Sequence, residues 1–173
     1  MKKLLALALA FCLSPAASAS PPEAATGADH TVEAPAGAHA THANHVGVFL
    51  GGTTFLGDHP QTVLTAGLDY ERRLSELFGV GLLVDFPMDL GHYSFAVLAA
   101  PMLVVHPVAG LKVIVAPGLD YAHEEAAFVA RAGIGYDLHL GAYTLAPTFN
   151  FDYVLAEHPH QALVFGLALG RGF

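Results

Sequence analysis

Cysteine, positive charge and long apolar runs are scarce in this sequence. Its single cysteine, Cys12, lies in an apolar stretch near the N-terminus, so a chain cleaved after that stretch carries no thiol, which suits an oxidising compartment. Only seven lysines and arginines stand against 15 acidic residues, and they are not clustered, so a nucleic-acid partner is excluded because nothing would neutralise its phosphates. No apolar run reaches the ~20 residues of a membrane-spanning helix, although 54% of the residues are hydrophobic.

The N-terminal residues have the three parts of a secretory signal peptide. Lys2 and Lys3 form a basic start, and residues 4–13 form an apolar segment too short to cross a bilayer. Residues 17–19 are the small Ala-Ser-Ala that signal peptidase accepts. We therefore predict that residues 1–19 are a cleaved export signal.

Residues 20–44 are rich in Ala, Pro, Gly, Thr and His and show no apolar periodicity. Such a segment cannot bury a core, so we predict a disordered linker. It carries His39 and His42, and His45 follows directly after it at the same spacing. A histidine-rich tract of this kind can collect metal ions weakly, and the alternative is a plain flexible lead-in.

In residues 45–173, large apolar side chains alternate with small or polar ones, and turn residues separate the alternating segments. Each segment has the ~9–11 residues, or slightly more, that cross a bilayer at a tilt. The predicted fold is therefore all-β: an eight-stranded antiparallel up-and-down transmembrane β-barrel. Because proline removes a ladder hydrogen bond, we expect local bulges at Pro101, Pro117 and Pro147. The predicted strands cover residues 45–55, 62–73, 79–87, 93–105, 111–122, 126–139, 142–154 and 161–173.

Alternation alone does not tell which face of the predicted strands points inward. In residues 142–154, Phe149 and Phe151 share one face while Asn150 and Asp152 share the other. A soluble β-sandwich or lipocalin-like barrel is the alternative, but it would turn a glycine-rich face to water. The aromatic residues favour the membrane barrel, because with both termini periplasmic they fall in two girdles at the bilayer interfaces. The outer girdle would be Phe86, Tyr93, Tyr121, Phe128 and Tyr153, and the inner one Tyr70, Tyr136, Tyr143 and Phe173.

Three features carry a resemblance to a known family: the eight predicted strands behind an export signal, the Gly-Leu-Asp-Tyr-Glu run at residues 67–71 before a tight turn, and the terminal Phe173. On these features, residues 45–173 resemble the small eight-stranded bacterial outer-membrane barrels of the OmpA/OmpX type. The resemblance implies residence among the lipids of the bacterial outer membrane. It also implies that Phe173 is the tag read by the barrel-assembly machinery.

Eight strands leave an interior that side chains can fill, so a porin-like channel is not expected. Six charged residues with inward parity lie near the predicted inner end of the barrel. Their opposite charges predict a buried salt-bridge network that plugs the lumen, with a proton or ion path as the alternative. The six are Asp69, Glu71, Arg73, Lys112, Arg131 and Asp137.

The predicted outer end is acidic and rich in histidine. Asp85, Asp120 and Asp152 point inward there with no basic partner at their depth, and every outer loop carries histidine. Neutral imidazole together with carboxylate suits zinc, nickel or copper, so we predict that these groups converge on a divalent metal ion. The alternative is a polar, pH-responsive surface without a metal. The loop histidines are His59, His92, His123, His158 and His160.

Catalysis is a further functional alternative. The run His92-Tyr93-Ser94 resembles the His-x-Ser pair of the lipid A deacylase family, in which the serine needs a base within hydrogen-bond reach. Ser94 has the inward parity, however, whereas an enzyme acting on membrane lipid needs its nucleophile to face the lipid. The sequence therefore predicts a non-enzymatic outer-membrane protein that binds divalent transition-metal ions at its mouth or assists their uptake. A purely structural or adhesive surface barrel is the alternative.

Overall fold

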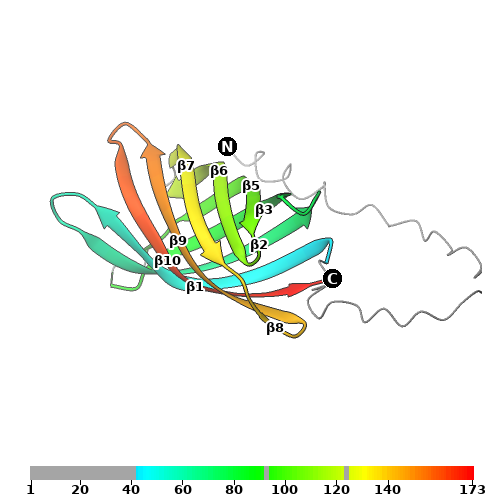
Figure 1. Ribbon diagram of the computed structural model, residues 1–173. Coiled ribbons are helices and arrows are strands. Elements are labelled where there is room, and N and C mark those ends of the chain that lie inside the picture. The colour runs from blue at the N-terminus through cyan, green and yellow to red at the C-terminus, as the bar shows by residue number, and fades with distance from the viewer. Residues whose placement is uncertain (1–41, 92–93, 123–124) are drawn as a thin grey trace, which may run out of the picture. The chain divides into compact units, whose positions relative to one another are not determined.

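A computed structural model describes residues 42–91, 94–122 and 125–173 (Figure 1). The predicted signal peptide and nearly all of the predicted linker lie outside the described residues. In the described part of the chain, no helix is long and apolar enough to cross a membrane. The candidate ligands outside it are His39, His92 and His123.

The described residues form one β-sheet that closes into a barrel (Figure 1). The strands are β1 (Asn44–Leu56), β2 (Gln61–Arg73), β3 (Phe78–Asp89), β4 (Ser94–Phe95), β5 (Val97–Val108), β6 (Leu111–Ala122), β7 (Glu125–Tyr136), β8 (Leu138–Leu140), β9 (Tyr143–Leu155) and β10 (His160–Gly172). Closure follows because β10 pairs with both β1 and β9. β4 and β5 both pair with β3, and β7 and β8 both pair with β9, so each of these pairs is one interrupted strand. The barrel thus has eight antiparallel strands, and the predicted fold is confirmed.

The two ends of the barrel differ. At one end β1 begins, β10 ends and short turns join the strands; we call it the terminal end. Two of these turns contain a glycine with positive φ, Gly110 at 80° and Gly141 at 67°, a conformation that glycine adopts without steric cost. The opposite end, which we call the loop end, carries the other connections, among them residues 57–60 and 156–159.

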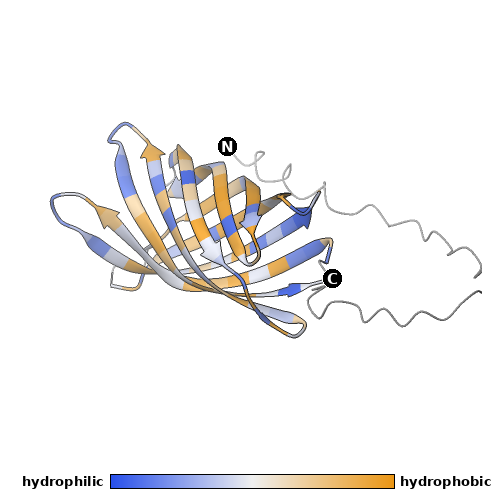
Figure 2. Ribbon diagram, in the orientation of Figure 1, coloured by the Kyte–Doolittle hydropathy of each residue, from blue (hydrophilic) through white to orange (hydrophobic). Residues whose placement is uncertain are grey.

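Large apolar side chains cover the outside of the barrel, and the residues between them point inward. On β10, Leu167 and Leu169 are 51% and 54% exposed, whereas Val164 and Ala168 are 1% and 7% exposed. Figure 2 shows the resulting alternation of apolar and polar segments along the strands. A continuous apolar surface of this kind is stable in lipid and not in water, so the predicted outward parity holds.

Exposed aromatic residues mark both ends of this apolar surface. Tyr121, Phe128 and Tyr153 lie near the loop end, and Tyr136 and Tyr143 lie near the terminal end. Phe173 is 61% exposed at the terminal end, and its backbone exchanges two hydrogen bonds with Asn44, at 2.9 and 3.1 Å. These positions match the two predicted girdles; Tyr93 lies outside the described residues.

The inside of the barrel is filled by side chains. Phe49 of β1 points inward, and glycines make room for it: an ideal Cβ on Gly51 would lie 2.6 Å from its ring, and one on Gly166 would lie 2.8 Å away. An apolar cluster fills further volume; its buried members include Leu83, Leu98, Met102, Val104, Val129 and Val154. Packing of this density leaves little space for a solvent path.

The prolines interrupt hydrogen bonding without the bulges that we expected. Pro101 and Pro117 fall opposite each other in a part of the β5–β6 ladder that is unpaired, and the register is the same on both sides of the gap. Pro147 pairs with Leu167 in an unbroken β9–β10 register. The register of β5 and β6 shifts instead between Val105 and Val108, at the terminal end.

Candidate functional site

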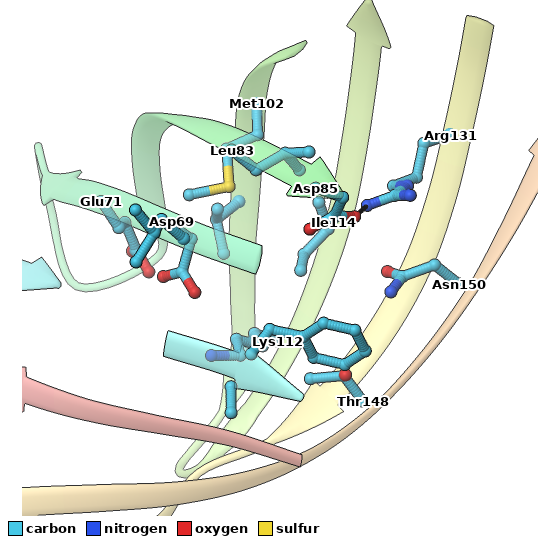
Figure 3. A pocket seen from close by; sticks show the side chains of 14 residues that line it. Asp69, Glu71, Leu83, Asp85, Met102, Lys112, Ile114, Arg131, Thr148 and Asn150 are labelled. Carbon is cyan, nitrogen blue, oxygen red and sulfur yellow. Dashed lines mark hydrogen bonds and ion pairs between the residues drawn. The ribbon is translucent and has the colours of Figure 1, made fainter. Parts of the chain in front are cut away.

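Along the inside of the described part of the barrel, cavities lie in the middle and at both ends. The middle one has a volume of only about 50 Å³, whereas cavities of about 340 Å³ and 300 Å³ lie at the terminal end and the loop end. Figure 3 shows the charged side chains that line the middle cavity, among them Asp85, Lys112 and Arg131. The described lumen therefore consists of two vestibules separated by a packed middle.

Arg131 holds two carboxylates together in this middle region. Its Nε and Nη2 donate to the two carboxylate oxygens of Asp152 at 2.7 and 2.8 Å, and its Nη1 donates to Asp85. Arg131, Asp85 and Asp152 are only 5%, 5% and 3% exposed. Two-point contact between guanidinium and carboxylate is among the strongest hydrogen-bonded pairs in proteins, so this cluster fixes the middle of the lumen.

The prediction that Asp85 and Asp152 lack a basic partner is wrong. Parity alone put Arg131 too close to the inner end, whereas the β7–β9 register pairs it directly with Asp152. The tight turn at residues 141–142 is a sequence signal that could have found this pair. β8 and β7 pair with β9 in one continuous register, so counting back along both strands from that turn places Arg131 opposite Asp152.

A second charged cluster lies near the terminal end, where the salt-bridge network was predicted. Lys112 Nζ lies 2.8 Å from Asp137 Oδ1, and Arg73 Nε lies 3.9 Å from Glu71 Oε1. His106 also belongs here: its Nε2 lies 2.7 Å from the same Glu71 oxygen. These contacts compensate the buried charges, as a plugged lumen requires.

His45 belongs to the barrel interior. It lies on β1 with its ring turned inward, where Nε2 is 2.8 Å from Thr144 Oγ1 and Nδ1 is 3.9 Å from Asp69 Oδ2. The terminal-end cavity is lined by His45 together with His42 and His139. Of the evenly spaced histidines His39, His42 and His45, the last two therefore line this cavity.

At the loop end, the structure brings together two of the predicted metal ligands. Asp120 and His160 line the same cavity, and His160 is close enough to act electrostatically on the Asp120 carboxylate. The His160 ring also lies 5.9 Å from the ring of Phe55. On another wall of the cavity, Gln61 Nε2 donates to Asp89 Oδ2 at 2.7 Å.

Within the described part of the chain, the other predicted ligands of the barrel mouth do not line this cavity. His59 and His158 are exposed in their loops, and Asp85 and Asp152 are bound by Arg131. Among the residues that the structure describes, no three His, Cys, Asp or Glu side chains stand close enough to one another to hold a metal ion.

Comparison with known proteins gives matches in structure only. No protein-family model and no curated protein sequence matches the chain. The crystal structure of Neisserial surface protein A (NspA) matches it with a TM-score of 0.54 and 6% identity, over 76% of this chain and 97% of that one. The N-terminal β-barrel domain of OprF from Pseudomonas aeruginosa matches with a TM-score of 0.51 and 16% identity, over 76% of this chain and 99% of that one.

The chain thus has the fold of the small eight-stranded outer-membrane β-barrels. The resemblance to this architecture, inferred from strand parity and the terminal aromatic residue, is confirmed at the level of the fold. At these identities the likeness establishes the fold alone, because such barrels carry unrelated functions.

Proposed function

We propose that the protein is a non-enzymatic barrel of the bacterial outer membrane that binds a divalent transition-metal ion, such as Zn²⁺, Ni²⁺ or Cu²⁺, in its loop-end cavity. The observation that carries this proposal is that Asp120 and His160 line one cavity of about 300 Å³. Carboxylate and imidazole are ligands that these metals accept. The connections at the same end of the barrel supply further imidazoles: His59, His92, His123 and His158.

Location in the outer membrane is supported by the physical character of the surface. The exposed leucines and valines of the strands form an apolar belt between two rims of aromatic residues, which is the surface expected where a barrel meets the core and the two interfaces of a bilayer. The export signal at residues 1–19 delivers the chain to the periplasm, and the terminal end then faces the periplasm.

The packed middle of the lumen favours binding at the mouth over passage of the ion. The cavity beside Arg131 holds only about 50 Å³, and Arg131 already binds the carboxylates of Asp85 and Asp152, so neither carboxylate is left to carry a metal ion through the middle. The same observation supports the second candidate function, a structural or adhesive surface barrel without a metal.

The position of Ser94 supports a non-enzymatic role. Ser94 lines the loop-end cavity and is half-buried. A serine that attacks a membrane lipid needs access from the lipid-facing surface, where the described residues of this region present Phe95 at 70% exposure.

Metal binding at the mouth is tested by titrating the mature chain, folded in detergent, with zinc, nickel and copper in a calorimeter. We expect the double variant Asp120→Asn with His160→Ala to lose one equivalent of bound metal, because it lacks both ligands of the cavity. Binding should also weaken as the pH falls through ~6.5, where imidazoles become protonated and cease to be ligands. Glu76→Gln, an exposed charge change at the terminal end, is the matched control and should bind as the parent does.

An unchanged stoichiometry in the double variant would contradict the metal proposal. The mouth would then be a polar surface, and the structural or adhesive barrel would be the better account.

Assembly by the barrel-assembly machinery is tested at Phe173. We expect Phe173→Ala to lower the yield of heat-modifiable barrel in outer-membrane fractions several-fold, while export and signal cleavage proceed normally. The substitution keeps the backbone hydrogen bonds to Asn44, so a loss reports on the aromatic side chain and not on closure of the barrel. Leu169→Ala, which removes an exposed apolar side chain from β10, the strand directly before Phe173, is the control. Equal yields for the two variants would show that Phe173 is not an assembly tag.

A further inference from the structure

The terminal-end cavity is lined by three histidines from different parts of the chain. His42 precedes β1, His45 lies on β1, and His139 lies on β8. The volume of the cavity, about 340 Å³, is ample for a metal ion together with water molecules that complete its coordination.

The strand register joins His139 and Asp69 in one series of inward-facing residues, which we call the ring. Each member of this ring is the direct cross-strand partner of the next. Such partners have their Cβ atoms about 4.5–5.5 Å apart. His139 and Thr144, at one end of the series, line the terminal-end cavity, and Asp69, at the other end, lines the middle cavity. The ring order is His139, Thr144, Gly170, Gly47 and Asp69.

Two glycines of this ring leave the space that imidazole and carboxylate groups occupy. An ideal Cβ on Gly170 would overlap the His45 ring, and one on Gly47 would overlap the Asp69 carboxylate. His45 therefore lies across the ring, between Thr144 on its Nε2 side and Asp69 on its Nδ1 side.

A third glycine accommodates the second imidazole. Gly172 lies two residues beyond Gly170 on β10, and an ideal Cβ there would lie 2.5 Å from the His42 ring. The imidazoles of His45 and His42 therefore pack against Gly170 and Gly172 of β10. A larger residue at either glycine would displace the imidazole that packs against it.

This arrangement orients His45 as a metal ligand. Metal-binding histidines commonly donate their second ring N–H to a carboxylate, which fixes the ring and makes the ligating nitrogen more basic. Asp69 lies on the Nδ1 side, so Nε2 is the nitrogen available to a metal ion, which would replace the Thr144 hydroxyl as its partner.

The other two histidines can join His45 by turning their side chains. Among the described residues no three such groups stand at coordinating distance before a metal binds. His42 and His139 are both exposed and line the same cavity, so on metal binding their rings would turn toward Nε2 of His45, and His139 would exchange its present contact for the metal ion.

The charge of the lumen favours a cation. Seven carboxylates line the described lumen, against three permanently cationic side chains. Imidazole ligands remain neutral, so a divalent ion at the terminal end would offset part of this excess. The carboxylates are Asp69, Glu71, Asp85, Asp89, Asp120, Asp137 and Asp152, and the cations are Arg73, Lys112 and Arg131.

We propose that the terminal-end cavity is a separate binding site for a divalent transition-metal ion, with His42, His45 and His139 as ligands and Asp69 as the residue that positions His45. The packed middle of the lumen lies between this site and the loop-end cavity, so each can exist without the other.

The test uses the full mature chain carrying Asp120→Asn and His160→Ala, so that the loop-end cavity does not contribute. One equivalent of Cu²⁺ is added to the folded protein in detergent, and the coordinated nitrogens are counted by electron paramagnetic resonance. We expect three imidazole nitrogens, and two after either His42→Ala or His139→Ala. Asp69→Asn should keep three nitrogens but weaken binding by roughly 10–100-fold, because a positioning residue acts through the ligand that it orients.

Two matched controls remove histidines that the proposal does not use. His158→Ala in a loop and His39→Ala in the predicted linker should both keep three nitrogens. Heat-modifiable mobility on a gel verifies that each variant is folded, and if the double-variant background does not fold, the same count is made on the parent chain and on His139→Ala alone.

The proposal is overturned if His139→Ala leaves the nitrogen count unchanged, if His39→Ala abolishes binding, or if the folded barrel binds no copper. In the variant that lacks Asp120 and His160, these results do not bear on the loop-end cavity. That cavity is tested separately, by the calorimetric comparison of this double variant with the parent chain.

Discussion

Replacing Arg131 with methionine should destabilise the folded barrel by about 3–5 kcal/mol. The substitution keeps much of the side-chain volume but leaves Asp85 and Asp152 as uncompensated carboxylates in a region where both are at most 5% exposed. The measurement is a urea titration of the barrel in lipid vesicles, followed by electrophoretic mobility and circular dichroism because the chain contains no tryptophan. The matched control is Arg171→Met, since Arg171 lies on the outer surface over the Tyr143 ring and its loss should cost far less.

Neutralising the carboxylates should restore much of the lost stability. The triple variant with Arg131→Met, Asp85→Asn and Asp152→Asn has no unpaired charge left in the middle of the lumen, so it should be more stable than Arg131→Met alone. If the triple variant were as unstable as the single one, packing and not charge would explain the effect. If Arg131→Met were as stable as the parent, the central cluster would not hold the lumen together.

Replacing Leu167 with arginine should destabilise the barrel by about 2–4 kcal/mol, because a charge at the middle of a lipid-facing strand must leave water for the bilayer core. Leu167 lies near the midpoint of β10 and is 51% exposed on the outer surface. The neighbouring change Ala168→Ser places a small polar group on the lumen face and should cost much less. The reverse order of sensitivities in a vesicle folding titration would mean that the faces of the strands are assigned the wrong way round.

The strands and their faces could be predicted because lipid imposes a strict rule on the sequence. Every backbone polar group in a bilayer must be paired within the protein, so strand lengths, alternation and tight turns all carry the same signal. The start of β1 obeys the rule although large apolar residues occupy both of its faces. Val48 and Leu50 face outward, and Phe49 faces the lumen, where Gly51 and Gly166 leave space for its ring.

The depth of the lumen residues was harder to predict, because it depends on the stagger between strands as well as on parity. Arg131 has the expected inward face, but only the register against β9 shows that it meets Asp152. The contact of Arg131 with Asp85 joins strands that are not neighbours in the barrel, and no hairpin count can supply it.

The candidate sites were predicted in part for the same reason. Loop histidines could be assigned to one end of the barrel, but loop conformation decides which of them meet, and Asp120 with His160 is the pair that the described structure brings to one cavity. His139 received no role from the sequence, because its place beside Thr144 and His45 arises from the closure of the barrel through β8, β9 and β10.

The central claim, that the apolar outer face lies in lipid, is tested most directly by spin labels on single cysteines. The only cysteine, Cys12, lies in the predicted signal peptide, so the mature chain offers a clean background. Labels replace the mid-strand residues Val115, Phe149 and Leu167 in vesicles, and Tyr121 and Tyr143 report on the two rims. The account predicts that the three mid-strand labels collide with oxygen far more than with a water-soluble nickel reagent, and that this preference declines at the rims. Mid-strand labels that favour the nickel reagent would contradict it.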